Sequence, residues 1–164
     1  MAYWKPNVTV AAVVERDGRL LMVEERTIHG LRLNQPAGHL DPGEALAHAV
    51  AREALEETGW TVEPVALLGV YMARHRSSAE GVDVTYLRHA FVCRAVSHDA
   101  ARVLDVPVER ALWMRPDEIL AAPERHRSPL VARTVVDWRA GRRFPLDLLW
   151  TDPSALDTPP GAAS

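Results

Sequence analysis

The amino-acid sequence predicts a single α/β domain in which helices cover both faces of a mixed β-sheet. The chain has 164 residues, of which 48% are hydrophobic and 25% are charged, the balance of one globular domain with a sizeable core. Strand-like and helix-like segments both occur without strict alternation, so the sheet is expected to be mixed rather than purely parallel. No repeat of any period is visible, which excludes solenoids and propellers.

The first elements expected are two strands joined by a tight turn. Residues 8–14 and 20–23 are dominated by aliphatic side chains. The Asp17-Gly18 pair between them is the strongest short signal for a β-hairpin, because both residues tolerate the left-handed backbone that such turns require. A hairpin at this point would open the sheet.

A long helix is expected from Asp41 to Gly59. The Asp41-Pro42 pair precedes a stretch rich in alanine, leucine and glutamate, and a glycine follows it, which is the usual punctuation of a helix. Asp41 and Glu44 also have the spacing of a capping box.

The second half of the chain is expected to complete the domain, which we place at residues 1–150. The strand candidates are residues 65–72, 82–96 and about 111–114, and the helix candidates are residues 116–121 and 129–138. Residues 151–164 contain Pro153, Pro159 and Pro160 among small residues, so we expect a disordered tail there.

The charge pattern and the first residues argue against several classes of protein. The 19 basic and 22 acidic side chains leave a formal net charge of −3 and form no basic block, so no nucleic acid duplex is expected as a partner. No basic segment followed by an apolar run opens the chain, and no stretch is long enough to cross a bilayer. We therefore expect a cytoplasmic protein with no membrane partner, and the lone Cys93 fits a reducing compartment.

The expected long helix turns acidic side chains toward the protein. On a helical wheel that starts at Leu46, the apolar stripe also contains Glu53 and Glu57, and Glu56 lies beside it. Carboxylates at three- and four-residue spacing repel one another and are stable together when a cation lies between them. Since no thiolate or paired histidine is nearby, these oxygen ligands favour magnesium or manganese over zinc. Magnesium often shares its coordination with phosphates, which indicates hydrolysis of a phosphoanhydride or phosphate ester.

The wheel alone is also compatible with a solvated acidic helix end held by a salt bridge from Arg52 to Glu56. The residues around the helix favour the metal site. Gly38 is followed after five residues by Glu44, and after seven more by Arg52-Glu53-Ala54-Leu55-Glu56-Glu57-Thr58-Gly59-Trp60. This segment resembles the Nudix box, the signature of the Nudix hydrolase family, at every fixed position. Ala54 is smaller than the aliphatic residue common there, a departure that affects no charged group.

The resemblance implies the Nudix fold, an α/β/α sandwich with a loop–helix–loop whose carboxylates bind divalent metal and, through it, the diphosphate of a substrate. Glu53 and Glu57 would be the principal metal ligands, with Glu56 acting directly or through water and Gly38 offering its backbone carbonyl. Arg52 would orient the glutamates by charge-assisted hydrogen bonds.

Two further glutamates have open roles. Glu44 is expected either near the metal or as a capping residue, and the capping role is favoured. The base that activates water would be Glu53, Glu57 or a carboxylate from another loop, and Glu109 is the candidate from outside the box.

Segments outside the box resemble the NudJ-type phosphatases, a subgroup of the family. They are residues 5–11, 34–40, 127–131 and 141–146, and the likeness extends over nearly all of residues 5–149. These phosphatases release inorganic phosphate from nucleoside di- and triphosphates and from the diphosphate of the thiamine pyrimidine precursor. Leu33 stands where a tryptophan is common, which weakens any expectation of base stacking at that position.

Three residues are candidates for contacts with the substrate. Asn34 and Gln35 would pair with the edge of a heterocycle, or would instead satisfy backbone groups in a turn. Arg88, in the middle of an expected strand, would bind phosphate or pair with a carboxylate.

The predicted function is a magnesium-dependent Nudix phosphohydrolase of small phosphorylated heterocycles. The alternatives are a Nudix pyrophosphatase acting on ADP-ribose, a dinucleotide or an oxidised nucleotide, and a non-catalytic Nudix-fold nucleotide sensor. Both a monomer and a homodimer are compatible with the sequence.

Overall fold

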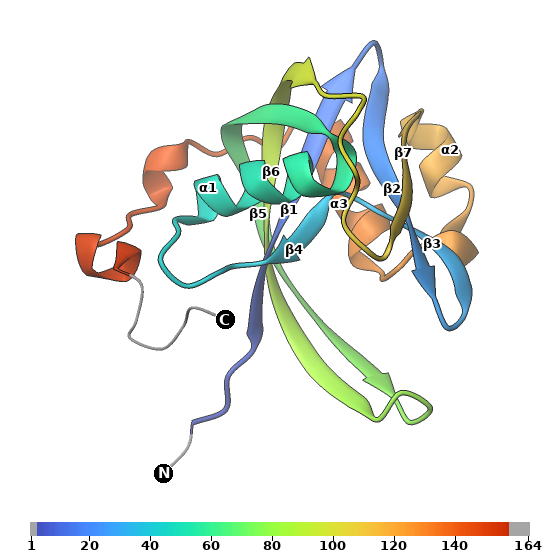
Figure 1. Cartoon of the computed structure of the whole chain (residues 1–164), viewed down its shortest axis with the longest axis horizontal. Helices are drawn as coiled ribbons and strands as arrows, with labels where there is room; N and C mark the ends of the chain where they lie inside the picture. The colour runs from blue at the N-terminus through green and yellow to red at the C-terminus, as the bar shows by residue number, and fades with distance from the viewer. Residues whose placement is uncertain (1–2, 158–164) are drawn as a thin grey trace.

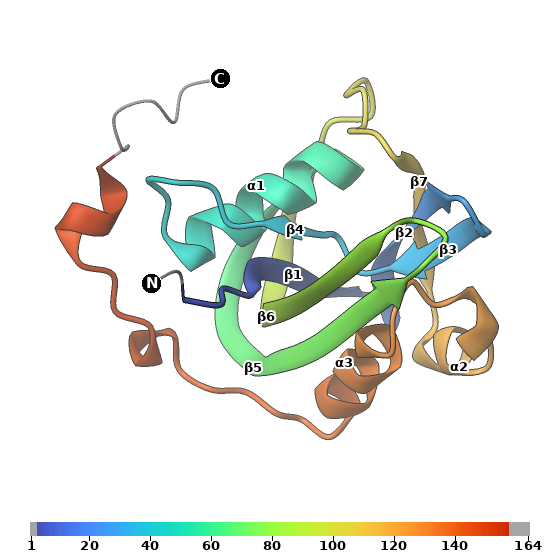
Figure 2. The same cartoon turned by 90° about the horizontal axis from the view of Figure 1, so that it is seen from below.

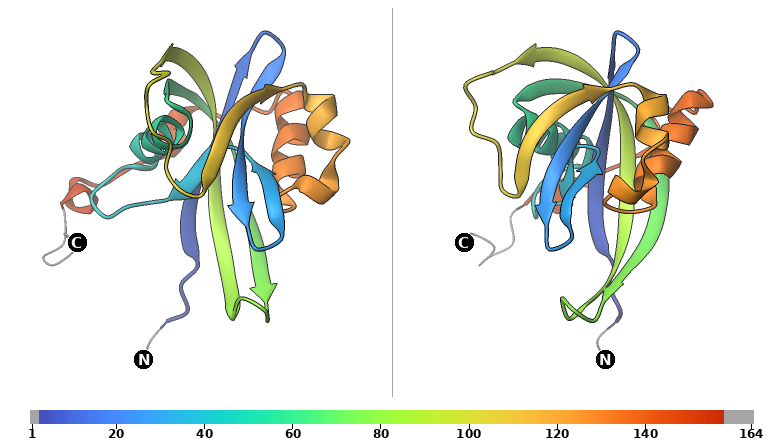
Figure 3. Two further views of the ribbon diagram at one scale, coloured as in Figure 1. Left: turned by 45° about the vertical axis from the view of Figure 1, so that its right-hand side comes forward. Right: turned by 90° about the vertical axis from the view of Figure 1, so that its right-hand side faces the viewer.

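This computed structural model describes residues 3–157. They fold around a seven-stranded mixed β-sheet with helices on both of its faces (Figure 1). The strands are β1 (Asn7–Arg16), β2 (Arg19–Thr27), β3 (Gly30–Asn34), β4 (Ala37–His39), β5 (Trp60–Ser77), β6 (Val82–His98) and β7 (Val108–Met114). The helices are α1 (Leu46–Thr58), α2 (Pro116–Leu120) and α3 (Leu130–Arg139), with short 3-10 helices η1 (Pro123–Arg125), η2 (Leu146–Leu148) and η3 (Pro153–Leu156). Helix α1 covers one face of the sheet, and α2 and α3 cover the other (Figure 3). The predicted α/β/α sandwich is confirmed.

Strand β1 is central to the sheet. The strand order is β3-β2-β1-β6-β5, with β4 also pairing with β1 and β7 with β2. The β1–β6 pair is parallel and places Thr9 opposite Arg88, whereas the other pairs are antiparallel. Because side chains alternate along a strand, successive β1 residues face opposite helical layers.

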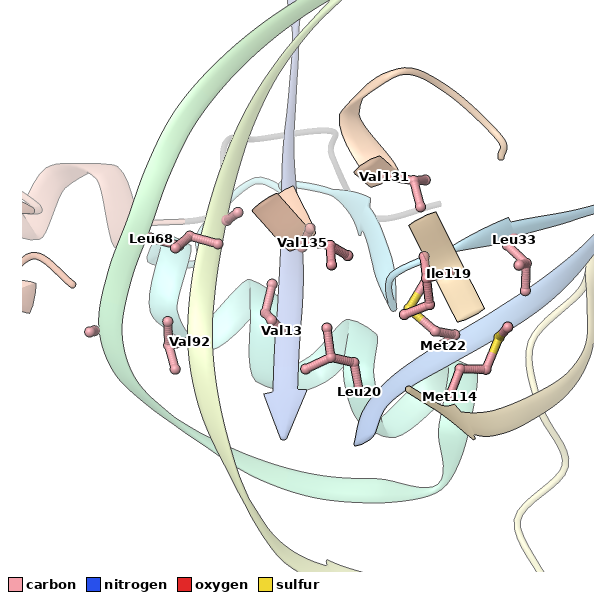
Figure 4. Packing of buried hydrophobic residues seen from close by; sticks show 13 residues of the cluster. Val13, Leu20, Met22, Leu33, Leu68, Val92, Met114, Ile119, Val131 and Val135 are labelled. Atoms are coloured by element: carbon pink, nitrogen blue, oxygen red, sulfur yellow. The ribbon is translucent and has the colours of Figure 1, made fainter. Parts of the chain in front are cut away.

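Hydrophobic clusters hold both layers to the sheet. On the α2 and α3 side, Val13 packs with Ile119, Val131 and Val135 (Figure 4). On the α1 side, the alternate residues of β1 pack against the helix, in a cluster that includes Val10, Ala12, Val14, Ala49, Val50 and Ala54. Each large aliphatic side chain buried in this way contributes about 1.5–3 kcal/mol, so α1 and α3 are both fixed against β1.

The predicted hairpin is confirmed between β1 and β2. Asp17 and Gly18 have φ values of 52° and 73°, the left-handed pair that matches the twist of the flanking strands. The later strands are longer than predicted. Strands β5 and β6 form a hairpin arm that projects from the rest of the sheet (Figure 1) and is seen from its tip in Figure 2. Strands β3 and β4 were not predicted as strands, because segments of five and three residues give too short a pattern.

Helix α1 begins at Leu46, later than the predicted start at Asp41. Pro42 and Gly43, which has φ of 83°, make a turn instead, and the N-cap residue Ala45 makes no side-chain cap. The predicted end is correct. Gly59 is left-handed at φ of 72°, and its N–H donates to the Leu55 carbonyl at 2.9 Å.

The segment expected to be a tail lies partly within the described residues. There, Asp152 accepts a hydrogen bond from the Ser154 N–H at the start of η3. Residues 158–164 lie outside the described residues. No helix in residues 3–157 is long and apolar enough to span a membrane.

Candidate active site

A cavity of about 580 Å³ opens where α1, the central strands and the start of α3 meet. Helix α1 supplies its acidic wall, which we define as Glu53, Glu56 and Glu57. The α3 wall consists of Thr9 of β1, Arg88 of β6, and Arg127, Ser128 and Pro129 from the segment that leads into α3. The cavity therefore joins elements from both helical layers.

The acidic wall contains carboxylates that are largely removed from water. Glu57 is 8% exposed, and its Oε2 accepts a hydrogen bond from the Ala37 N–H at 2.8 Å. Burial raises the pKa of Glu57 to about 8, and the carboxylates of Glu25, Glu53 and Asp105 act in the same direction. Burial also raises the pKa of Glu53. Both carboxylates therefore ionise less readily than a free glutamate, and a bound cation would favour their charged form.

Arg52 connects the acidic wall to the loop before α1. Its guanidinium donates to Glu44 at 2.6 and 3.0 Å, to Glu53 at 2.8 Å and to Glu56 at 3.0 Å. It also donates to the His39 carbonyl at 3.0 Å. This planar fork fixes several carboxylates at once, which a lysine could not do.

Glu44 has a structural place beside this arginine. Besides accepting from Arg52, its carboxylate accepts from the Asp41 N–H at 2.8 Å. Burial opposes ionisation, but Arg52 and the Asp41 N–H outweigh it and lower the pKa of Glu44. Glu44 therefore stabilises the loop and the arginine rather than the first turn of α1, which corrects the predicted capping box.

Gly38 lies directly against Glu53. A Cβ atom at position 38 would lie 2.1 Å from the Glu53 carboxyl carbon and 2.2 Å from both of its oxygens. A side chain at this position would displace the Glu53 carboxylate, so glycine lets that carboxylate lie directly against β4.

Arg88 and Asn34 line the same cavity from the sheet. Arg88 is 8% exposed and donates from Nη1 to the Asn34 Oδ1 at 3.4 Å. Burial lowers the pKa of Arg88 to about 10. Asn34 donates in turn to Glu25 at 2.9 Å, so its amide is engaged by protein groups on both sides.

Gln35 does not reach the cavity, contrary to the expectation that it contacts the substrate. It is 1% exposed, and its Nε2 donates to the Val131 carbonyl at 3.1 Å. Neighbouring residues of an extended segment point to opposite sides, so Asn34 and Gln35 cannot both line one cavity. The amide of Gln35 stabilises the packing of α3.

Glu109 also lies away from the cavity. It is paired with Arg26 at 2.5 Å on the exposed edge where β7 meets β2. Asp105, four residues earlier, lines the cavity, and its N–H donates to the Glu56 carbonyl at 3.0 Å. Asp105, rather than Glu109, is the carboxylate of this segment that lines the cavity, and the sequence did not distinguish it from other acidic loop residues.

Comparison with known proteins identifies the family. The family model described as NUDIX domain matches residues 4–136. The chain belongs to the Nudix family. Phosphatase NudJ of Escherichia coli K12 is 38% identical over 147 residues, which cover 89% of this chain and 92% of that protein.

Solved structures agree with this assignment. A NUDIX hydrolase from Nitrosomonas europaea is 47% identical with a TM-score of 0.82, covering 91% of this chain and 99% of its own. A UDP-X diphosphatase shares the fold at 18% identity and a TM-score of 0.67, covering 88% and 68% of the two chains. This Nudix chain is therefore a hydrolase that acts on phosphorus anhydrides.

The oxygen atoms offered by α1 and by Gly38 fit a hard divalent cation. Carboxylate oxygens and a backbone carbonyl are the ligands that magnesium and manganese prefer. Within residues 3–157, no three acidic, histidine or cysteine side chains converge as a ready-made metal cluster. The reason is local, since Arg52 bonds Glu53 and Glu56 while Ala37 holds Glu57. The raised pKa values of Glu53 and Glu57 mean that these carboxylates hold their protons more tightly than free glutamate, and a bound cation would offset the cost of ionising them.

The sequence analysis missed three further residues that line the cavity. Glu25 of β2 is 7% exposed, lines the cavity and pairs with Arg127 at 3.2 Å. Tyr86 and His39 form part of the lining, with ring centroids 6.2 Å apart and planes tilted by 58°. These two rings come from strands that are distant in the sequence, so no short-range pattern predicts that they meet.

Proposed function

We propose that this chain is a divalent-metal-dependent Nudix phosphatase that releases orthophosphate from small nucleoside di- and triphosphates or from the diphosphate of the thiamine pyrimidine precursor. The observation that carries the proposal is the acidic wall, where α1 presents three glutamates to the cavity. The likeness to Phosphatase NudJ over 92% of that protein's length supports orthophosphate rather than pyrophosphate as the product.

The residues have separate roles in this proposal. Glu53, Glu56, Glu57 and the Gly38 carbonyl hold magnesium, or manganese in its place, and Arg52 keeps the glutamates in position. When bound, the metal neutralises phosphate charge and makes a water more acidic.

The carboxylates also provide the proton acceptor. Glu53, Glu57 and Asp105 line the cavity and are the groups that can take the proton of the attacking water. Among these three, Asp105 is the one that is not also a proposed ligand of the metal.

The test is a substrate panel with separate product assays. Nucleoside di- and triphosphates, thiamine-pathway diphosphates, ADP-ribose and dinucleotides are incubated with magnesium, and orthophosphate and pyrophosphate are scored separately. The expected result is orthophosphate release that stops with EDTA and in Glu53→Gln. Glu124→Gln is the matched control, because Glu124 is exposed on η1, outside the cavity.

Other results would favour the alternatives. Pyrophosphate or two nucleoside monophosphates as products would identify a pyrophosphatase of ADP-ribose, dinucleotides or oxidised nucleotides. Tight binding without turnover on the whole panel would favour a non-catalytic sensor. A cytoplasmic location, and the choice between monomer and homodimer, remain predictions.

A further inference from the structure

Arg88 is a buried cation without an ionic partner. It is 8% exposed, yet it forms no ion pair with any carboxylate of residues 3–157, and its Nε has no hydrogen-bond partner. The side-chain hydrogen bond that it makes within residues 3–157 is the long one to Asn34, and the carboxylates of Glu25 and Glu57 favour its charged form without pairing with it. A buried charge that lacks a partner is costly, so such a group indicates a ligand of opposite charge.

Thr9, across the strand pair from Arg88, is also a buried polar residue whose side chain lacks a hydrogen-bond partner. It is 5% exposed, and its Oγ1 has no hydrogen-bond partner. Parallel pairing of β1 with β6 places Thr9 directly opposite Arg88, and both residues line the cavity. Two adjacent buried polar groups without partners are uncommon in native proteins. An arginine offers donors alone, so the missing partner must be an acceptor.

The start of α3 adds positive potential at the same place. Arg127, Ser128 and Pro129 line the cavity immediately before this ten-residue helix. The N-terminal end of a helix carries a partial positive charge and favours anions. The α3 wall is therefore positive where the acidic wall is negative.

The position of Arg88 limits the size of the group it contacts. Arg88 is buried, whereas Tyr86, two residues earlier on the same face of β6, is half-buried toward the hairpin arm. A small tetrahedral anion suits the buried position, and a planar ring suits the more open one beside Tyr86 and His39.

We propose that Arg88 of β6 and Thr9 of β1, which line the same cavity as the residues before α3, bind the terminal phosphoryl group of the substrate. This inference rests on the proposed function and deepens it. A terminal group held on the α3 wall, with the acidic wall beside it, is positioned to leave as orthophosphate. A diphosphate whose terminal phosphate carries an ester group has one charge fewer and a bulkier end, so the same subsite disfavours it.

The first experiment measures binding without catalysis. Orthophosphate is titrated by calorimetry in EDTA into the wild-type chain, Arg88→Gln, Thr9→Val and Arg19→Gln. Loss of one hydrogen bond to a charged group is expected to weaken binding about 10- to 100-fold in Arg88→Gln and Thr9→Val. Arg19→Gln should bind as wild type, because Arg19 is exposed in the β1–β2 hairpin. Unchanged affinity in both cavity variants would overturn the proposal.

The second experiment measures specificity. The ratio of kcat/KM for a nucleoside diphosphate to kcat/KM for its terminal methyl ester is expected to favour the free terminal phosphate, and to fall about 10-fold or more in Arg88→Gln. Arg88→Lys, which keeps the charge but not the fork, should recover part of the ratio. Thr9→Val is nearly isosteric and should lower the same ratio, so it tests the proposal even if Arg88→Gln does not fold. A change in preference among heterocycles, with the ratio unchanged, would assign these residues to the ring and overturn the proposal.

The failure of this inference can be told apart from failure of the proposed function. Glu57→Gln should lose turnover yet still bind orthophosphate in EDTA. If no diphosphate is hydrolysed but phosphate binding depends on Arg88, the anion subsite stands and the phosphatase proposal fails.

Discussion

The two sides of the sheet treat buried carboxylates in opposite ways. Glu24 has a side chain that is 4% exposed and receives hydrogen bonds from Arg110 at 2.5 Å and Arg125 at 2.6 Å. The Arg110 hydrogen bond is the main reason that the pKa of Glu24 is lowered, even though burial opposes it. This carboxylate is ionised and fully paired, so its role in the fold is structural.

Asp137 on α3 follows the same pattern. Burial would raise its pKa, but hydrogen bonds from Tyr71 at 2.9 Å and from Arg133 and Arg142 at 3.1 Å lower it overall. On α1, Glu57 is buried and Glu53 is partly buried. Glu57 accepts from one backbone N–H and Glu53 from one arginine, and the pKa values of both are raised. What separates a structural carboxylate from a candidate metal ligand is therefore how many donors neutralise its charge, rather than how deeply it is buried.

The largest effect is expected from Glu57→Gln. Turnover should fall about 1000-fold or more, because the variant removes a proposed metal ligand. Without metal and at alkaline pH, Glu57→Gln should also have a higher free energy of unfolding than the wild type. The folded pKa of Glu57, about 8, lies above its usual 4.5, so its stabilising effect is complete below pH 4.5 and is lost as pH rises to 8.

Urea unfolding in EDTA at several pH values checks this sign. Wild type should lose up to about 5 kcal/mol of unfolding free energy between pH 4.5 and pH 8 from this group, and Glu57→Gln should not. Magnesium should raise the Tm of the wild type and have little effect on the variant. Equal pH dependence in both proteins would contradict the comparison.

Gly38→Ala is expected to reduce turnover about 100-fold by displacing the Glu53 carboxylate. Gly69→Ala is a matched control for crowding, since its Cβ would lie 2.8 Å from the Tyr71 hydroxyl, next to the paired Asp137. The control should lower Tm and leave kcat/KM near wild type. If both variants lose only stability, the close approach of Gly38 to Glu53 has no catalytic meaning.

Arg52→Lys keeps the charge but loses the fork that holds Glu44, Glu53 and Glu56. We expect magnesium affinity to weaken about 10- to 100-fold, as is usual when a residue that orients metal ligands is changed. Magnesium titration of activity measures the midpoint. A midpoint equal to that of wild type would show that the glutamates need no such support.

The smallest effect is expected from Glu24→Gln. Because Arg110 and Arg125 are partly exposed, the loss should be about 1–2 kcal/mol of unfolding free energy, with turnover unchanged. The lowered pKa of Glu24 means that its contribution is present above pH 4.5 and disappears as pH falls through the lower folded value. Acid unfolding of the two proteins should therefore converge at low pH. A loss of turnover would place Glu24 in the active site.

Much of this architecture follows from local patterns. The Asp17-Gly18 turn, the end of α1 at Gly59 and the acidic stripe of that helix are set by residues only a few positions apart. The start of α1 was misplaced because Asp41 and Glu44 do form a capping-type hydrogen bond, but in a loop that precedes the helix. Strands β3 and β4 were missed because their hydrogen bonds, rather than their short sequences, define them.

The sequence by itself determined the family, the fold class and the acidic face of α1, because a period of 3.6 residues and a fixed motif spacing are properties of the chain alone. Only the tertiary structure decided which distant residues share the cavity. Pairing of β1 with β6 brought Thr9 beside Arg88, and pairing of β7 with β2 took Glu109 to Arg26 and left Asp105 in the cavity that Glu57 also lines. Such pairings depend on the burial of whole strands and helices, a collective free energy that no local segment records.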